Sequence, residues 1–327
     1  MQAQDFGPAK WAIGRRTKGA TDAQLDRAYA AGTILRTHVL RPTWHFVLPA
    51  DIRWLLAATA PRIQARSAFR YRQLGLDAAT LERSGSLLGG ALCGGRQLTR
   101  KEAAATLTAA GIAVDGQRLA YILMNAELNG IICSGAPHGS QHTYALLRER
   151  APQARELTRD EALAELTLRY FTSHGPATAK DFASWASLTV ADVTLGLQAV
   201  GARLRHEVID GVAFWSAGTP PAPALGSPTV HLLQGYDEYV MGYSETKHVL
   251  ARPGSPWPPA TPPVFALVVL LDGRLAGFWK RTIREGSVSV QVALREPFDA
   301  AQTRALETEA ARYGEFLGLG ATVVQVG

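Results

Sequence analysis

Residues 99–146, TRKEAAATLTAAGIAVDGQRLAYILMNAELNGIICSGAPHGSQHTYAL, decide the fold. The stretch begins with a capping-box pair, Thr99 and Glu102, and eight apolar-rich residues then lead to Gly111. This pattern predicts a helix that begins after Thr99 and ends before Gly111. After a short turn, apolar residues recur at helical spacing and predict a second helix: Leu119, Ile122, Leu123 and Ala126. IICSG and HTYALL flank a glycine-rich tip and predict a β-hairpin. Helix, turn, helix and hairpin in this order are typical of a winged helix.

The same order of elements recurs farther along the chain. A second capping box, Thr158 with Glu161, begins a helix, and two more helices are predicted over 176–188 and 189–201. Two β-rich runs then meet at the Asp-Gly pair of residues 210–211, as the strands of a hairpin do. This recurrence indicates internal repeats of one structural unit.

The first part of the chain is similar to an incomplete third copy. Helices are predicted over 8–16 and 21–32, and two short strands follow, broken at Arg41-Pro42. Two separate helices are predicted next, over 49–59 and 61–75.

The C-terminal region has the pattern of a mixed α/β unit. Two Pro/Gly-rich crossings, 218–228 and 252–263, precede or interrupt it. Its predicted elements are three β-rich runs, an amphipathic helix and a last strand: 265–273, 274–283, 287–295, 299–318 and 322–326. We therefore predict an α+β fold with tandem winged-helix units in four regions: an incomplete winged-helix unit with a basic helix over 1–98, winged helices over 99–150 and 151–218, and a mixed α/β unit over 219–327.

Composition indicates a globular protein. Hydrophobic residues make up 47% of the 327 residues and charged residues 19%, a balance that excludes a disordered chain. The longest apolar stretch, FALVVLL, is too short to cross a bilayer, and residue 1 does not begin a signal peptide. Two cysteines, Cys93 and Cys133, indicate neither a disulfide framework nor a cysteine-based zinc site. We expect a cytoplasmic protein with no membrane segment.

Positive charge is concentrated in the first quarter of the chain. Residues 1–72 hold 12 Lys and Arg against 4 Asp and Glu, a net +8, whereas residues 73–327 hold 22 against 24, a net −2. Such clustering is typical of a protein that binds a polyanion such as nucleic acid. Arginine makes up 28 of the 34 cationic residues, a bias that a GC-rich genome would explain, but that bias does not explain the clustering.

One predicted helix carries much of this charge. Arg62, Arg66 and Arg70 fall four residues apart, so they share one face, with Phe69 and Tyr71 close by. Guanidinium groups match phosphate oxygens, and aromatic rings between them can stack on bases. Alone, the pattern fits either a DNA-binding face or an ordinary solvated basic face, and the clustering of positive charge favours a face that binds DNA.

Histidines form a second candidate group. His38 and His45 flank Arg41, but no carboxylate or third histidine has metal-ligand spacing, so we predict no metal site. Each histidine alone is typical of a hydrogen-bonded structural residue; in a nucleic-acid cleft the three side chains would contact phosphate or a displaced base.

The stretch HLLQGYDEYVMGY, residues 231–243, combines carboxylates with tyrosines. Asp237 and Tyr239 are candidates for acid–base chemistry, although the pattern favours a structural role that joins the C-terminal unit to the winged helices. The sequence carries no P-loop, no dinucleotide fingerprint, no GxSxG elbow and no HExxH motif, which disfavours kinases, NAD-dependent dehydrogenases, α/β-hydrolases and zincins.

Four blocks, in order, resemble the AlkZ-like DNA glycosylases along nearly the whole chain: QAQDFGPAKWAIGRR, RTHVLRPTWHFVLPADIRWLLA, LLQGYDEYVMGY and VVLLDGRLAGFWKRT. The resemblance implies tandem winged helices and a monofunctional glycosylase that acts, as a monomer and without metal or organic cofactor, on alkylated or crosslinked purines in double-stranded DNA. The family's Gln-x-Gln signature falls on Gln2 and Gln4. Family members carry further helices before this motif, so we expect the natural start to lie upstream of residue 1.

The two glutamines suit this chemistry. In an extended segment, side chains two residues apart share a face, so both carboxamides can orient one water molecule. A carboxamide is a feeble base, which suffices only when the leaving base already carries positive charge; Asp5 would face the other way. The alternative is a non-enzymatic winged-helix DNA-binding protein, such as a transcriptional regulator.

Overall fold

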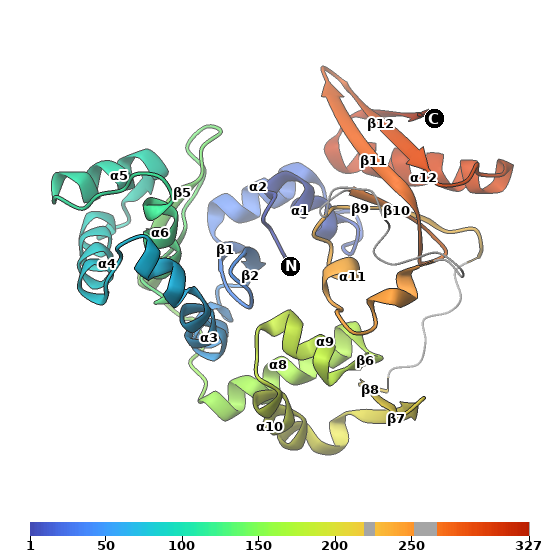
Figure 1. Cartoon of the computed structure of the whole chain (residues 1–327). Coiled ribbons are helices and arrows are strands. Elements are labelled where there is room, and N and C mark those ends of the chain that lie inside the picture. The colour runs from blue at the N-terminus through green and yellow to red at the C-terminus, as the bar shows by residue number, and fades with distance from the viewer. Residues whose placement is uncertain (219–225, 252–266, 327) are drawn as a thin grey trace. The chain divides into compact units, whose positions relative to one another are not determined.

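The computed structural model describes residues 1–218, 226–251 and 267–326, and its fold is α+β (Figure 1). The chain forms two compact units. The sheet unit comprises Met1–Asp26, His174–Asp181 and Arg205–Gly327, and the helical unit comprises Arg27–Ser173 and Phe182–Leu204. This division into two units does not test the four regions expected from the sequence, which stay a prediction. The predicted crossing 252–263 lies wholly outside the described residues, as do residues 219–225 of the first crossing and residues 265–266 of the first β-rich run.

The helical unit consists of helices with small antiparallel sheets. Its elements are β1 (Leu35–His38), β2 (Trp44–Val47), α3 (Ile52–Gln73), α4 (Ala78–Leu92), β3 (Gln97–Thr99), α5 (Arg100–Ala109), α6 (Arg118–Leu128), β4 (Ile132–Ser134), β5 (Thr143–Leu146), α7 (Leu147–Arg150), α10 (Val190–Val200) and the 3₁₀ turn η1 (Gly201–Arg203). Three helices pass from one unit to the other along the chain: α2 (Asp22–Ala31), α8 (Arg159–His174) and α9 (Ala179–Ala186).

Residues 99–146 form the two helices and the hairpin that their sequence predicts. α5 and α6 pack against α4, and β3, β5 and β4 form an antiparallel sheet beside them (Figure 1). The Thr99 hydroxyl accepts the Glu102 N–H at 3.3 Å while the Glu102 carboxylate accepts the Thr99 N–H at 2.8 Å, so the predicted capping box is confirmed. The helix α4 was not predicted; its signal was Asp77, which caps the Thr80 N–H at 2.8 Å.

The expectation of two helices around Pro61 was wrong, because α3 is one continuous helix of 22 residues. Pro61 has no N–H and leaves the Ala57 carbonyl without its usual helical donor. Buried residues on both sides of the proline hold the two halves in line, since breaking the helix would expose them: Trp54, Leu55, Leu56, Ile63 and Tyr71.

The sheet unit is built on one five-stranded sheet of order β13-β12-β11-β10-β9. Its elements are α1 (Phe6–Gly14), β6 (Ala177–Thr178), β7 (Arg205–Ile209), β8 (Val212–Ser216), β9 (Val230–Leu233), α11 (Glu238–Met241), the 3₁₀ turn η2 (Lys247–Leu250), β10 (Leu267–Leu271), β11 (Arg274–Arg284), β12 (Ser287–Leu294), α12 (Ala300–Leu317) and β13 (Gly320–Gln325). Only the β12–β13 pair is parallel among the described strands, with α12 as the crossover.

Aromatic side chains join α1 to this sheet. Trp11 lies 5.0 Å from Tyr313 and 5.2 Å from Phe316 between ring centroids, and Tyr313 lies 5.2 Å from Trp279 of β11. The indole N–H of Trp11 donates to the Leu232 carbonyl at 2.7 Å. These contacts place α1, and with it residues 2–5, against β9 and α12.

A second sheet, β6-β8-β7, carries the predicted hairpin. Asp210 and Gly211 both have positive φ, +51° and +78°, as a two-residue type I′ turn requires, so this hairpin is confirmed. The helix predicted over 8–16 is α1, which begins two residues earlier than expected, at Phe6.

Candidate functional site

Residues 2–5 form a short arm before α1. Residue 2 makes a single β-bridge, and the chain bends at residues 4 and 5. Ala3 is fully buried, Gln2 is 2% exposed and Gln4 is half-buried. Of the two candidate glutamines, Gln4 is therefore the less buried residue.

The turn that follows β9 holds this arm. The backbone N–H of Gln2 donates to Glu238 Oε1 at 2.8 Å, and Gln234 Nε2 donates to the Gln2 carbonyl at 3.5 Å. Gln234 is 1% exposed and Glu238 is 8% exposed. Both polar groups of the residue 2 backbone are thus bonded to side chains more than 230 positions away.

Asp237 has a structural position. It caps α11 by accepting the Tyr239 N–H at 2.9 Å, and its two oxygens accept Arg16 Nη2 at 2.6 Å and Nη1 at 2.9 Å. Burial lowers the pKa of Arg16, but the hydrogen bond and charge of Asp237 outweigh this and raise it. Asp237 is fully buried, so the contacts in place support its structural interpretation over acid–base chemistry.

Beside Glu238 lies a cavity of about 560 Å³ with an aromatic lining that includes His174, His206, Phe214, Tyr239 and Tyr243. His174 Nε2 is 3.8 Å from Glu238 Oε2, and the Tyr243 hydroxyl donates to the His174 carbonyl at 3.0 Å. Burial raises the pKa of Tyr243 to about 12, so its hydroxyl keeps its proton at neutral pH. Tyr239 is 39% exposed and donates its hydroxyl to the Gly273 carbonyl at 3.2 Å.

Asp5 faces cationic side chains. It is exposed and lines a cavity of about 330 Å³ together with Tyr236, Lys280 and Arg281. Burial raises the pKa of Tyr236, and the negative charge of Asp5 raises it further. A Cβ at Gly7 would lie 3.0 Å from Arg281 Nη2, so the guanidinium lies directly over the start of α1. Lys280 and Arg281 were not predicted as site residues, because nothing in the sequence states that β11 reaches the arm of residues 2–5.

The predicted basic face lies on α3. Arg62 and Arg66 are exposed, and no carboxylate lies within ion-pair distance of either among the residues that the structure describes. Arg70 is half-buried and donates to Gln117 Oε1 at 2.6 and 3.2 Å. Phe69 of the same helix is 63% exposed, and its ring centroid lies 5.9 Å from the Arg72 guanidinium carbon.

The histidine group is largely internal. His38 is 8% exposed and its Nδ1 is hydrogen-bonded to Glu127, which also accepts the Trp44 indole N–H at 3.4 Å. His45 is fully buried; its Nδ1–H donates to the Thr43 carbonyl at 2.9 Å and its Nε2 lies 3.3 Å from Arg41 Nη2. The Thr43 carbonyl on one side and Arg41 on the other thus orient the His45 ring, and Arg41 is half-buried beside it.

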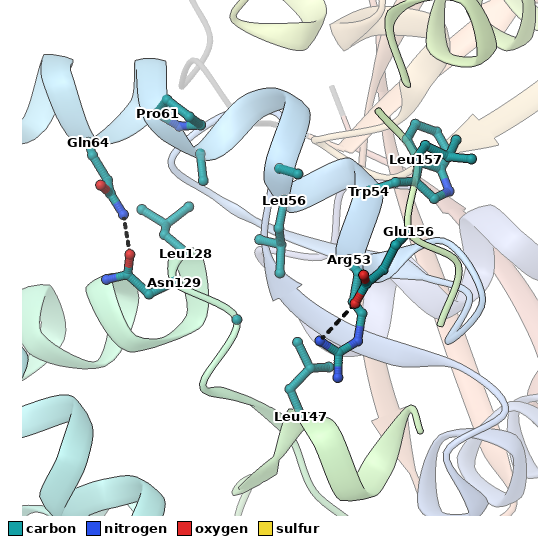
Figure 2. Close-up of a pocket in the computed structure, with 13 residues that line it drawn as sticks. Arg53, Trp54, Leu56, Pro61, Gln64, Leu128, Asn129, Leu147, Glu156 and Leu157 are labelled. Atoms are coloured by element: carbon teal, nitrogen blue, oxygen red, sulfur yellow. Dashed lines mark hydrogen bonds and ion pairs between the residues drawn. The ribbon is translucent and has the colours of Figure 1, made fainter. Parts of the chain in front are cut away.

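The helical unit also has a pocket of about 510 Å³ along α3. Figure 2 shows Pro61 and Gln64 facing Leu128 and Asn129, with Arg53 and Glu156 at the opposite end. Gln64 Nε2 donates to Asn129 Oδ1 at 3.0 Å, and Arg53 lies 3.7 Å from Glu156. The three arginines of the basic face are not among the residues that line this pocket.

The start of α3 is fixed by Asp51, which is 5% exposed. Its carboxylate accepts Arg155 and Arg169 at 2.6 Å each and the Trp54 indole N–H at 3.0 Å. Burial would raise the pKa of Asp51, but the hydrogen bonds from Arg169, Arg155 and Trp54 hold it below its ordinary value. This network orients the helix that carries the basic face.

A family model for AlkZ-like DNA glycosylases, described as "DNA glycosylase AlkZ-like", matches residues 1–316. The chain belongs to the AlkZ-like DNA glycosylase family. The resemblance seen in the four sequence blocks is therefore confirmed. Among curated proteins, none matches this sequence.

The AlkZ-like fold is also found in a solved structure. The Streptomyces sahachiroi DNA glycosylase AlkZ superposes with a TM-score of 0.76 at 22% identity, over 99% of this chain and 91% of that chain. Within the described residues of this AlkZ-like chain, no three His, Cys, Asp or Glu side chains gather as a metal site would need. Nor does any helix in the described ranges have the length and apolar character to cross a membrane.

Proposed function

We propose that this AlkZ-like protein is a monofunctional DNA glycosylase that removes N3- or N7-alkylated or crosslinked purines from double-stranded DNA. A water molecule oriented by the carboxamides of Gln2 and Gln4 attacks the anomeric carbon, the N-glycosidic bond breaks, and the cationic base leaves as a neutral molecule. The proton that the attacking water loses passes to solvent. The observation that carries the proposal is the arm of residues 2–5, whose backbone is bonded to the buried side chains of Gln234 and Glu238.

The amide chemistry limits the substrate. A carboxamide accepts one hydrogen bond from water and donates another, but it removes protons poorly. Excision therefore depends on the positive charge that alkylation gives the base. Gln4, which is half-buried, provides the contact with water, and the more buried Gln2 supports it.

Cationic side chains in both units support a role for DNA. Arg62 and Arg66 project from α3 without a carboxylate partner in the described part of the chain. Lys280 and Arg281 line the cavity that also contains Asp5. Both pairs suit contact with phosphate oxygens, which position the duplex without reading its sequence.

We also propose that two runs of the chain form winged helices. The order β3, α5, α6, β4, β5 is repeated as β6, α9, α10, β7, β8, and we assign both runs as winged helices of a monomer. A non-enzymatic regulator would more typically carry positive charge on its recognition helix. In α6 only Arg118 is cationic, and its Nη1 is bonded to the Leu74 carbonyl.

The test is excision of 7-methylguanine from a duplex, followed by alkaline cleavage of the abasic sites. We expect Gln4→Ala to lower the single-turnover rate about 100-fold or more without changing DNA affinity. Gln291→Ala, which removes another half-buried glutamine of the sheet unit, serves as the matched control. Equal rates for Gln4→Ala and wild type would refute the role of the pair, and DNA binding without any excision would favour the regulator.

A further inference from the structure

We infer that Glu238 is a positioning residue for the glutamine pair, an inference that rests on the proposed function. Glu238 Oε1 accepts the Gln2 N–H at 2.8 Å, and the side chain of Glu238 is 10% exposed. The Glu238 side chain contacts the backbone of the arm and would not touch the substrate. Its effect on the reaction would pass through the placement of Gln2 and Gln4.

The buried charge explains why this hydrogen bond orders the arm. A carboxylate removed from water loses much of its hydration free energy, and it regains this only through donors of good geometry. The Gln2 N–H is such a donor, and a hydrogen bond to an ionised acceptor is stronger than one between neutral groups. Displacing the arm would leave the Glu238 carboxylate buried with one hydrogen bond fewer.

Gln234 binds the other polar group of the residue 2 backbone, its carbonyl oxygen. Its Oε1 accepts the Tyr236 N–H at 3.1 Å, which orients the carboxamide so that Nε2 faces the Gln2 carbonyl. The Gln2 carbonyl contact is long, 3.5 Å, so Glu238 holds the arm more firmly than Gln234 does. Together they restrict rotation of the residue 2 backbone on both sides of its side chain.

Placement of this kind matters for hydrolysis. Water, carboxamide and anomeric carbon must be held within about 0.5 Å of the productive geometry. Gln4 lies two residues beyond the clamped position, with fully buried Ala3 between them. An arm released at residue 2 would let both carboxamides move, and the rate would fall while phosphate contacts elsewhere maintain DNA affinity.

Two variants separate charge from mere acceptance of a hydrogen bond. Glu238→Ala removes the acceptor, whereas Glu238→Gln keeps an oxygen at the same place without the charge. The matched control is Asp181→Asn, because Asp181 is also fully buried in the sheet unit and accepts the backbone N–H groups of Ser244 and Glu245 at 2.7 Å. None of its hydrogen bonds involves residues 1–5.

The first measurement is hydrogen exchange of the Gln2 amide by NMR on protein labelled with ¹⁵N-glutamine. We expect exchange to be about 10-fold or more faster in Glu238→Ala, intermediate in Glu238→Gln and unchanged in Asp181→Asn. This readout does not depend on glycosylase activity. Unchanged exchange in both Glu238 variants would overturn the inference.

The second measurement is single-turnover excision of 7-methylguanine below the unfolding temperature of every variant. We expect Glu238→Ala to lose about 100-fold in rate with DNA affinity unchanged, and Glu238→Gln to recover part of that loss. A wild-type rate despite faster Gln2 exchange, or an equal loss in Asp181→Asn, would overturn the inference. Absence of excision by the wild-type protein would instead refute the proposed function, while amide exchange would still decide whether Glu238 holds the arm.

Discussion

Removing Arg62 and Arg66 together should reduce DNA binding by an amount that can be worked out in advance. Both side chains are exposed on α3, and neither has a carboxylate partner among the described residues, so Arg62→Ala/Arg66→Ala should leave the fold intact. Each phosphate contact on duplex DNA contributes about 0.9 to the slope of log K against log salt. Two contacts therefore contribute about 1.8 to the slope, which is about 60-fold in affinity at roughly 0.1 M salt, or about 2.4 kcal/mol.

The assay is fluorescence anisotropy with an undamaged labelled duplex between about 50 and 200 mM salt. Arg304→Ala, which removes an exposed arginine of α12, is the control and should leave the slope unchanged within about 0.3. Arg70→Ala should have a smaller effect than either arginine of the pair, because Arg70 already donates to Gln117. If the double variant keeps the wild-type slope, the basic face of α3 is a solvated surface and does not bind DNA.

Two further predictions concern stability. Asp51→Ala should lower the free energy of unfolding by about 2 to 3 kcal/mol in urea titrations, because Arg155 and Arg169 lose their shared buried acceptor but are exposed enough to rehydrate. A loss no larger than that of Glu82→Ala, which removes an exposed carboxylate of α4, would contradict this. His231 has its pKa lowered to about 4, first by burial and then by the positive charge of Arg15. The unfolded ring binds a proton near pH 6.5, and the folded ring does not until about pH 4. The free energy of unfolding should therefore fall as pH drops through this window, by about 1 to 2 kcal/mol once solvent screening of the half-buried ring is allowed for. An equal fall in His231→Asn would show that other groups cause it.

Local patterns predicted much of the fold. The capping boxes at Thr99 and Thr158, the spacing of apolar residues in α6 and the Asp-Gly turn at 210–211 all appear where the sequence places them. Each of these signals depends on hydrogen bonds or side-chain spacing within a few residues, which the sequence states directly. The arginines of α3 share a helix for the same reason.

Pro61 shows where a local rule fails. Proline usually ends a helix, yet α3 continues through it because buried side chains on both sides pack into one core. The partners of the two histidines are likewise not stated by the sequence around them: His45 is fully buried, and His38 is bonded to Glu127, 89 positions away. Burial depends on which segments meet, and a single stretch of sequence does not state that.

By itself the sequence determined most of the long helices, the hairpins, the concentration of positive charge and the family through the order of its four blocks. Only the tertiary structure decided what holds the glutamine arm. The Gln2 N–H meets Glu238 across 236 positions of chain, and Lys280 and Arg281 reach the cavity of Asp5 from a strand of the C-terminal sheet. Such contacts arise because folding brings distant segments together to bury apolar surface, and the polar groups caught between them must then find partners in whatever segment lies opposite.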